Sequence, residues 1–190
     1  MRIYYLLLIV TLVTPFCKAT EAEPEVDIDR AECVVLLHGL WRTELSMKPL
    51  EWGLAEAGFS VANVTYPSLS YPIEELATLA VEEGVEECRA LGLEHIHFVT
   101  HSLGGILVRK YLADRNIKGL GRVVMLGPPN QGSQVADYIH SLDILRPFTP
   151  VAVAQLGTGA RSVPRQLGPV NFELGIIAGT DGELSVMPGA

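Results

Sequence analysis

One serine stands between two apolar runs in FVTHSLGGILVRKY, residues 98–111. The run over residues 95–100 is strand-like, and the run over residues 103–113 has helical spacing. Only His101 and Ser102 remain to form the turn, so the pattern predicts a tight reversal with Ser102 at its tip. Its hydroxyl would lie at the carboxyl edge of a sheet, above a helix start that favours negative charge.

Small residues surround this serine on both sides. Such a turn brings backbone close together and requires small residues two positions before and after the nucleophile. Here they are Thr100 and Gly104, with Gly105 next, so Thr100 replaces the first glycine of G-x-S-x-G. Ser102 could instead simply cap the helix, but capping does not explain the two glycines, and the pattern favours a nucleophile.

A second feature is LLHGLWR, where the first predicted strand ends. Gly39 allows a sharp loop there, and the N–H of Leu40 can then point towards the serine. With the N–H of Leu103 it would form a two-donor oxyanion hole. The alternative is that Gly39 is an ordinary loop glycine.

No histidine has the position expected of a general base. His140 is the only one after Ser102 and is expected on the surface or in a lid. His38 belongs to the oxyanion loop, His95 and His97 are expected to be structural, and the ring of His101 is expected to pack aside. His95-x-His97 alone is a weak metal signature, so no metal site is predicted.

The elements that must position these residues alternate between strands and helices. Strands are predicted over residues 33–38, 59–64, 95–100, 122–126 and 174–178, and helices over residues 44–57, 73–88 and 103–113. Strands separated by helices indicate right-handed crossovers and a mostly parallel sheet covered on both faces. The fold class is therefore α/β, a three-layer sandwich.

Two cysteines fall where this fold would bring them together. Cys33 opens the first strand, and Cys88 ends the helix over residues 73–88, close to its apolar face. Because helix ends that feed strands lie at the edge where strands begin, a disulfide between Cys33 and Cys88 is a hypothesis. The alternative is two buried thiols.

The segment between residues 127 and 175 gives a weaker pattern. Residues 130–145 are compatible with one helix, and residues 147–169 are rich in Pro and Gly. We interpret residues 144–170 as a lid or surface excursion within a domain over residues 31–190.

The amino-terminal residues resemble an export signal. Residues 1–19 combine an early charge, an apolar run and a small-residue ending, so a signal peptide cut after Ala19 and a linker over residues 20–30 are predicted. Export to the periplasm or outside the cell would follow; the alternative is a membrane anchor formed by residues 3–16.

Cleavage after Ala19 would change the formal charge of the chain from −8 to −10. That charge argues against nucleic acid binding and disfavours docking on anionic lipid, although an apolar lid could still contact a lipid surface.

At this point the chain resembles the α/β-hydrolase superfamily, in particular its small bacterial lipase and esterase-like members. The landmarks are VVLLHGL at 34–40, YP at 66–67, THSLGG at 100–105, GPPNQGS at 127–133 and GIIAG at 175–179. The resemblance implies ester hydrolysis through an acyl-enzyme, with a histidine as base, an acid that orients it, and no cofactor.

The resemblance also shows what is missing. The family places an acid after the late strand and the histidine beyond it. Asp181 is the candidate acid and Glu183 a weaker one, but only eleven residues follow Gly179 and none is a histidine. A plain turn aspartate is the alternative for Asp181. We expect the sequence to stop short of the last strand, the last helix and the catalytic histidine.

The sequence therefore predicts a serine ester hydrolase of lipase or esterase type, acting on a lipid or small-molecule ester. Trp41 and the apolar residues of 144–156 would line an acyl pocket, with simple packing as the alternative for Trp41. The other candidates are a non-catalytic or truncated relative that binds an acyl ligand or partner, and an acyltransferase that uses the same serine. The oligomeric state is not predicted.

Overall fold

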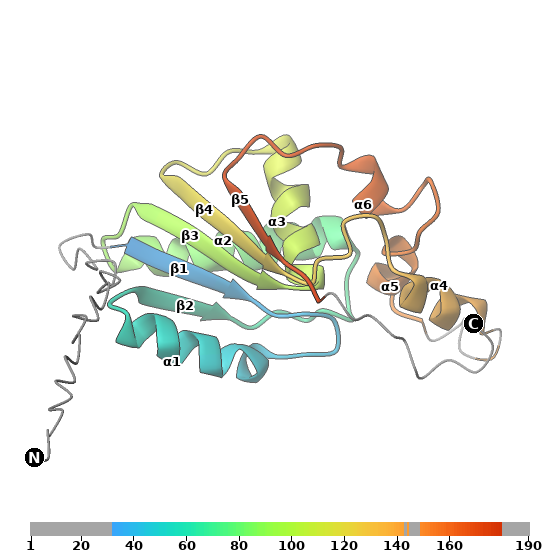
Figure 1. Ribbon diagram of the computed structural model, residues 1–190, viewed down its shortest axis with the longest axis horizontal. Helices are drawn as coiled ribbons and strands as arrows, with labels where there is room; N and C mark the ends of the chain where they lie inside the picture. The colour runs from blue at the N-terminus through green and yellow to red at the C-terminus, as the bar shows by residue number, and fades with distance from the viewer. Residues whose placement is uncertain (1–31, 143, 145–148, 180–190) are drawn as a thin grey trace, which may run out of the picture.

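The computed structural model describes residues 32–142, 144 and 149–179. It contains one sheet of five parallel strands in the order β2-β1-β3-β4-β5 (Figure 1). The strands are β1 (Glu32–Leu37), β2 (Ser60–Val64), β3 (His95–His101), β4 (Leu120–Leu126) and β5 (Leu174–Ile177). The predicted parallel α/β class is confirmed.

Helices cover both faces of this sheet. The 3₁₀ helix η1 (Glu44–Met47) and α1 (Lys48–Glu56) lie on one face, and α2 (Ile73–Ala90) and α3 (Leu103–Asp114) pack side by side on the other (Figure 1). Alternate residues of β1 enter two separate clusters: Val35 and Leu37 pack under α2 and α3, whereas Val34 and Leu36 pack with Met47. Because alternate residues of the buried strand β1 face opposite sides, the sheet is packed between two layers of helices, which gives three layers in all.

The best-predicted helix, α2, buries the face expected from its spacing. Ile73, Leu76, Ala77 and Ala80 are all buried, and Cys88 is fully buried at the end of the same face. Cys33 and Cys88 are joined by a disulfide bond, with their Cα atoms 5.8 Å apart. This is the pairing that the sequence hypothesis named.

The segment after β4 is more compact than expected. It contains α4 (Gln134–Ser141), α5 (Val151–Gln155) and α6 (Val163–Gln166), beside the carboxyl ends of the strands (Figure 1). Ala152 and Val153 are fully buried, so α5 packs into the domain, and the interpretation of residues 144–170 as a lid or surface excursion stays a prediction. The side chain of Gln155 secures this helix, since its Oε1 accepts from Ile73 N at 2.7 Å.

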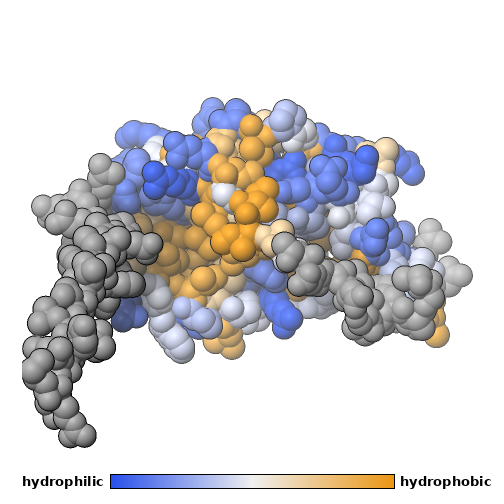
Figure 2. Space-filling model, viewed as in Figure 1, coloured by the Kyte–Doolittle hydropathy of each residue, from blue (hydrophilic) through white to orange (hydrophobic). Residues whose placement is uncertain are grey.

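One side of the sheet carries exposed apolar residues at its edge. Ile176 and Ile177 of β5 are 52% and 62% exposed, and Figure 2 shows apolar side chains gathered over β4 and β5. None of the described helices is long and apolar enough to cross a membrane. The predicted signal peptide, linker and anchor (residues 1–19, 20–30 and 3–16) lie outside the described residues.

Candidate active site

Ser102 lies in a strained turn between β3 and α3. Its φ is +50° and its ψ is −114°, values that side-chain-bearing residues seldom adopt. The turn is held by its own backbone, because Ser102 N donates to Leu126 O at 2.9 Å. The Ser102 side chain makes no capping hydrogen bond with α3. The capping explanation is therefore wrong, and within the described part of the chain the hydroxyl forms no hydrogen bond that would keep it from a substrate.

The glycines after the serine allow α3 to approach the sheet. A Cβ at Gly104 would lie 2.6 Å from Leu37 O, and one at Gly105 would lie 3.1 Å from Sδ of Met125. Thr100, in place of the motif's first glycine, is fully buried, and its hydroxyl donates to Val124 O at 3.5 Å. The threonine is accommodated because its side chain is buried and its hydroxyl has an acceptor on the neighbouring strand β4.

The loop after β1 lies directly against this turn. A Cβ at Gly39 would be 2.7 Å from Nδ1 of His101 and 3.3 Å from Cβ of Ser102. A side chain at position 39 would therefore collide with the turn, so Gly39 is more than an ordinary loop glycine. It brings the following amide, that of Leu40, to the same sheet edge as Ser102.

Two backbone donors are free at this edge. Among the described residues, the N–H groups of Leu40 and Leu103 donate no hydrogen bond. Leu103 is the first residue of α3, where an N–H has no intrahelical acceptor. Both donors are available for an anionic oxygen near Ser102, which is the chemistry of an oxyanion hole.

His38 braces the loop that carries Leu40. Its ring stacks on that of Tyr66, with centroids 4.0 Å apart, and its Nδ1 donates to Gly39 O at 2.8 Å. Its Nε2 accepts from the Tyr66 N–H at 3.5 Å, and the Tyr66 hydroxyl donates to His38 O. Burial lowers the pKa of His38, so the neutral ring persists. His38 is a structural brace and not a base.

No described histidine is hydrogen-bonded to Ser102. Burial lowers the pKa of His101, and the positive charge of Arg42 lowers it further. His140 is exposed near the end of α4. The candidate acids Asp181 and Glu183 lie outside the described residues. The described residues thus bring together the candidate nucleophile Ser102 and two unbonded backbone amides, and none of their histidines is bonded to Ser102.

At the opposite edge of the sheet, Glu32 joins the His95-x-His97 pair that the sequence analysis had named as a weak metal signature. Side-chain ligand atoms of Glu32, His95 and His97 lie within 4.8 Å of one another, a set that could suggest zinc. However, Nδ1 of His97 accepts from the Arg122 N–H at 2.9 Å. The ring proton therefore resides on Nε2, which faces Glu32 Oε2 at 3.5 Å. That nitrogen has no lone pair for a metal. The strand register, which pairs Glu32 with His95, could have revealed this group.

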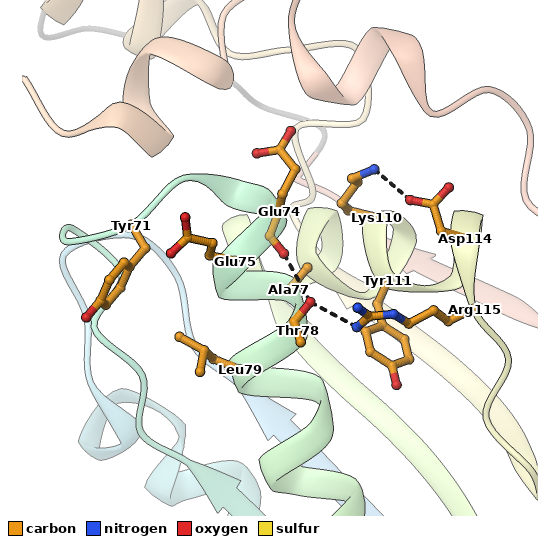
Figure 3. A pocket seen from close by; sticks show the side chains of 10 residues that line it. All are labelled: Tyr71, Glu74, Glu75, Ala77, Thr78, Leu79, Lys110, Tyr111, Asp114 and Arg115. Atoms are coloured by element: carbon orange, nitrogen blue, oxygen red, sulfur yellow. Dashed lines mark hydrogen bonds and ion pairs between the residues drawn. The ribbon is translucent and has the colours of Figure 1, made fainter.

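A hollow of about 660 Å³ lies between α2 and α3 (Figure 3). Its cations are already paired: Lys110 with Asp114 at 2.8 Å, and Arg115 with Thr78 at 2.9 Å and Glu82 at 3.1 Å. No unpaired cation selects an anionic ligand there, and we assign it none.

Comparison with known proteins gives one family match. The profile described as the alpha/beta hydrolase family matches residues 34–183. No curated protein sequence matches this chain.

Solved structures that share the fold include the following three. A mature lipase from Bacillus licheniformis is 19% identical, with a TM-score of 0.61, over 78% of this chain and 65% of that one. A phospholipase from Legionella pneumophila is 18% identical, with a TM-score of 0.59, over 78% and 38%. A monoacylglycerol lipase from Paleococcus ferrophilus is 21% identical, with a TM-score of 0.55, over 78% and 73%. The chain thus spans less than two thirds of the first two proteins.

Proposed function

The chain belongs to the alpha/beta hydrolase family, and on that premise we propose that it is a serine ester hydrolase of lipase or esterase type. The observation that carries the proposal is the backbone of Ser102, strained at φ +50° with no capping bond. Strain of this kind, about 1–3 kcal/mol, persists where the surrounding structure holds it and is concentrated at active sites.

The proposed chemistry follows the acyl-enzyme route. Ser102 Oγ forms a bond to the ester carbonyl carbon, and the carbonyl oxygen gains the negative charge. The N–H groups of Leu40 and Leu103 stabilise that charge; loss of one such donor costs about 3 kcal/mol in other enzymes. The C–O bond to the alcohol then breaks, the alcohol takes a proton, and water releases the acid. A general base must accept the Ser102 proton, and Asp181 is the acid proposed to orient that base.

A second candidate is a binding protein for an acyl ligand. The observation that favours it is the lack of a described histidine bonded to Ser102. Without proton transfer, the oxyanion donors and substrate binding alone would retain a residual acceleration of about 10³–10⁴-fold over water.

Two measurements separate these candidates. We expect the wild-type protein to cleave p-nitrophenyl butyrate and to be labelled by a fluorophosphonate, and Ser102→Ala to do neither. Ser141→Ala is the matched control, because Ser141 is an exposed serine whose hydroxyl donates only to Tyr138 O. Folded wild-type protein that binds the acyl chain but neither cleaves the ester nor takes the label would support the binding protein.

We also propose that the protein is exported. The support is the disulfide between Cys33 and Cys88, because such bonds persist in oxidising compartments. Recovery of the protein from the periplasm or medium, with residues 1–19 removed, is the expected result. Protein that stays in the cytoplasm with both thiols free would contradict it.

A further inference from the structure

An arginine follows the oxyanion loop and is held beside it by a strained turn. Arg42 N donates to Gly39 O at 3.2 Å, which closes a turn through Leu40 and Trp41. Trp41 adopts φ +55°, an uncommon conformation for a bulky residue. The turn fixes the backbone of Arg42, which lies two residues after Leu40, whose amide is proposed to stabilise the oxyanion.

The guanidinium of Arg42 has no carboxylate partner among residues 32–142, 144 and 149–179. The side chain is exposed and forms no ion pair with any described residue, although the chain has a formal charge of −8. The acid nearest in sequence, Glu44, is engaged elsewhere: it accepts from the hydroxyl of Thr65. That hydrogen bond, and not Arg42, is the main cause of the lowered pKa of Glu44. The Arg42 guanidinium thus stays unpaired among the described residues, although the protein as a whole is acidic.

The positive charge of Arg42 acts on the turn that contains Ser102. The charge of Arg42 contributes to the lowered pKa of His101, the residue immediately before Ser102. The backbone also links the two, because Arg42 N donates to Gly39 O and a Cβ at Gly39 would be 3.3 Å from Cβ of Ser102, so an anion bound at Arg42 would lie near the Ser102 turn.

Arg42 also lines a pocket of about 540 Å³ between the loop after β1 and the loop after β2. Trp41, Pro67 and Leu69 supply its apolar wall. Tyr66 also lines the pocket, and stacking of its ring on His38 holds it in place. The pocket combines apolar surface with a single unpaired guanidinium, whose planar fork binds carboxylate and phosphate groups through two hydrogen bonds.

We propose that this pocket binds an anionic group of the substrate, a phosphate or a carboxylate, and that Arg42 is its specificity-determining residue. The inference rests on the proposed function and refines it: the preferred ester would carry a negative charge either on its alcohol or on its acyl side.

Paired substrates test the inference and distinguish the two sources of charge. For the acyl side, p-nitrophenyl hemisuccinate is compared with p-nitrophenyl butyrate. For the alcohol side, a lysophosphatidic acid is compared with the monoacylglycerol of the same chain length. We expect wild-type protein to prefer one anionic member, and Arg42→Gln to reduce the anionic-to-neutral ratio of kcat/KM by about tenfold or more, as expected for a lost hydrogen bond to a charged group.

Two controls accompany these substrates. Arg89→Gln makes the same change of charge at an exposed arginine in the last turn of α2, at the other edge of the sheet, and should leave the ratio unchanged. Arg42→Lys keeps the charge but loses the fork, and should fall between wild type and Arg42→Gln. An Arg42→Gln ratio equal to that of wild type would overturn the inference.

A binding measurement separates failure of this inference from failure of the hydrolase proposal. In a Trp52→Phe background, Trp41 is the only tryptophan, and its fluorescence reports occupancy of the pocket. We expect hexyl phosphate or hexanoate to bind more tightly than hexanol, and Arg42→Gln to raise the anion's Kd by about tenfold. If this shift occurs while no ester is cleaved, the anion site stands and the hydrolase proposal fails. Equal anion affinity in both proteins would overturn the site.

Discussion

Gly104 offers the sharpest test of how the fold positions the serine. A Cβ at this position would lie 2.6 Å from Leu37 O, 2.9 Å from Leu37 Cβ and 3.0 Å from His38 O. Two of these atoms are backbone oxygens at the end of β1 and cannot rotate away. In Gly104→Ala, α3 must therefore move back by about 0.8 Å to restore ordinary van der Waals contact.

The expected cost can be worked out from two opposing effects. Overpacking of a well-packed core costs about 1–3 kcal/mol, and replacing a helical glycine with alanine returns about 1 kcal/mol. The overpacking is the larger effect, so the free energy of unfolding should fall by up to about 2 kcal/mol. The same movement displaces Ser102 and the N–H of Leu103, so fluorophosphonate labelling should slow in parallel.

Gly53→Ala is the matched control. A Cβ at Gly53 meets nothing within 4 Å, and the residue lies within α1, so the substitution should raise the free energy of unfolding by about 0.5–1 kcal/mol and leave labelling unchanged. Urea denaturation and labelling kinetics of the three proteins provide the measurements. The reasoning is refuted if Gly104→Ala is as stable as Gly53→Ala and is labelled at the wild-type rate.

Three further predictions concern stability. Reduction of the Cys33–Cys88 disulfide, which closes a sequence separation of 55 residues, should lower the free energy of unfolding by about 4 kcal/mol, measured by urea denaturation with and without reductant. Arg109 is buried and donates at 2.8 Å both to Asn130 Oδ1, between β4 and α4, and to Gly168 O, after α6. Its replacement by methionine should cost about 2 kcal/mol, because those acceptors lose their donor; a Tm equal to that of wild type would contradict this. Burial lowers the pKa of His38 below 6.5, so the unfolded chain binds a proton first as the pH falls. Stability should therefore be full above about pH 6.5 and decline below it, and His38→Gln should make that decline shallower.

Much of this fold follows from regular patterns in the sequence. The helix over residues 73–88 was predictable because its apolar residues recur at helical spacing, and the structure extends it only to Ala90. The turn at Ser102 was predictable because only His101 and Ser102 lie between the predicted strand over residues 95–100 and the predicted helix from residue 103; in the structure β3 includes His101, and Ser102 alone joins it to α3. The clash that excludes a side chain at Gly104 follows from the same tight connection.

Other features depend on contacts that no local pattern encodes. The short helices α5 and α6 were not predicted because their apolar residues are too few to show a period. Ala152 is buried only because α5 docks near the start of α2. The left-handed backbone of Trp41 has no sequence signal, since glycine is the residue expected there. Arg42 was missed for a related reason: its lack of a partner is visible only once the positions of the acids are known.

The proposed catalysis depends on a strained turn that directs the Ser102 oxygen towards the amides of Leu40 and Leu103. A crystal structure of the protein after reaction with an alkyl fluorophosphonate would show this arrangement. We expect phosphorus bonded to Ser102 Oγ, with the phosphoryl oxygen about 2.7–3.1 Å from both amide nitrogens. An adduct on another residue, or a phosphoryl oxygen that contacts neither amide, would contradict it.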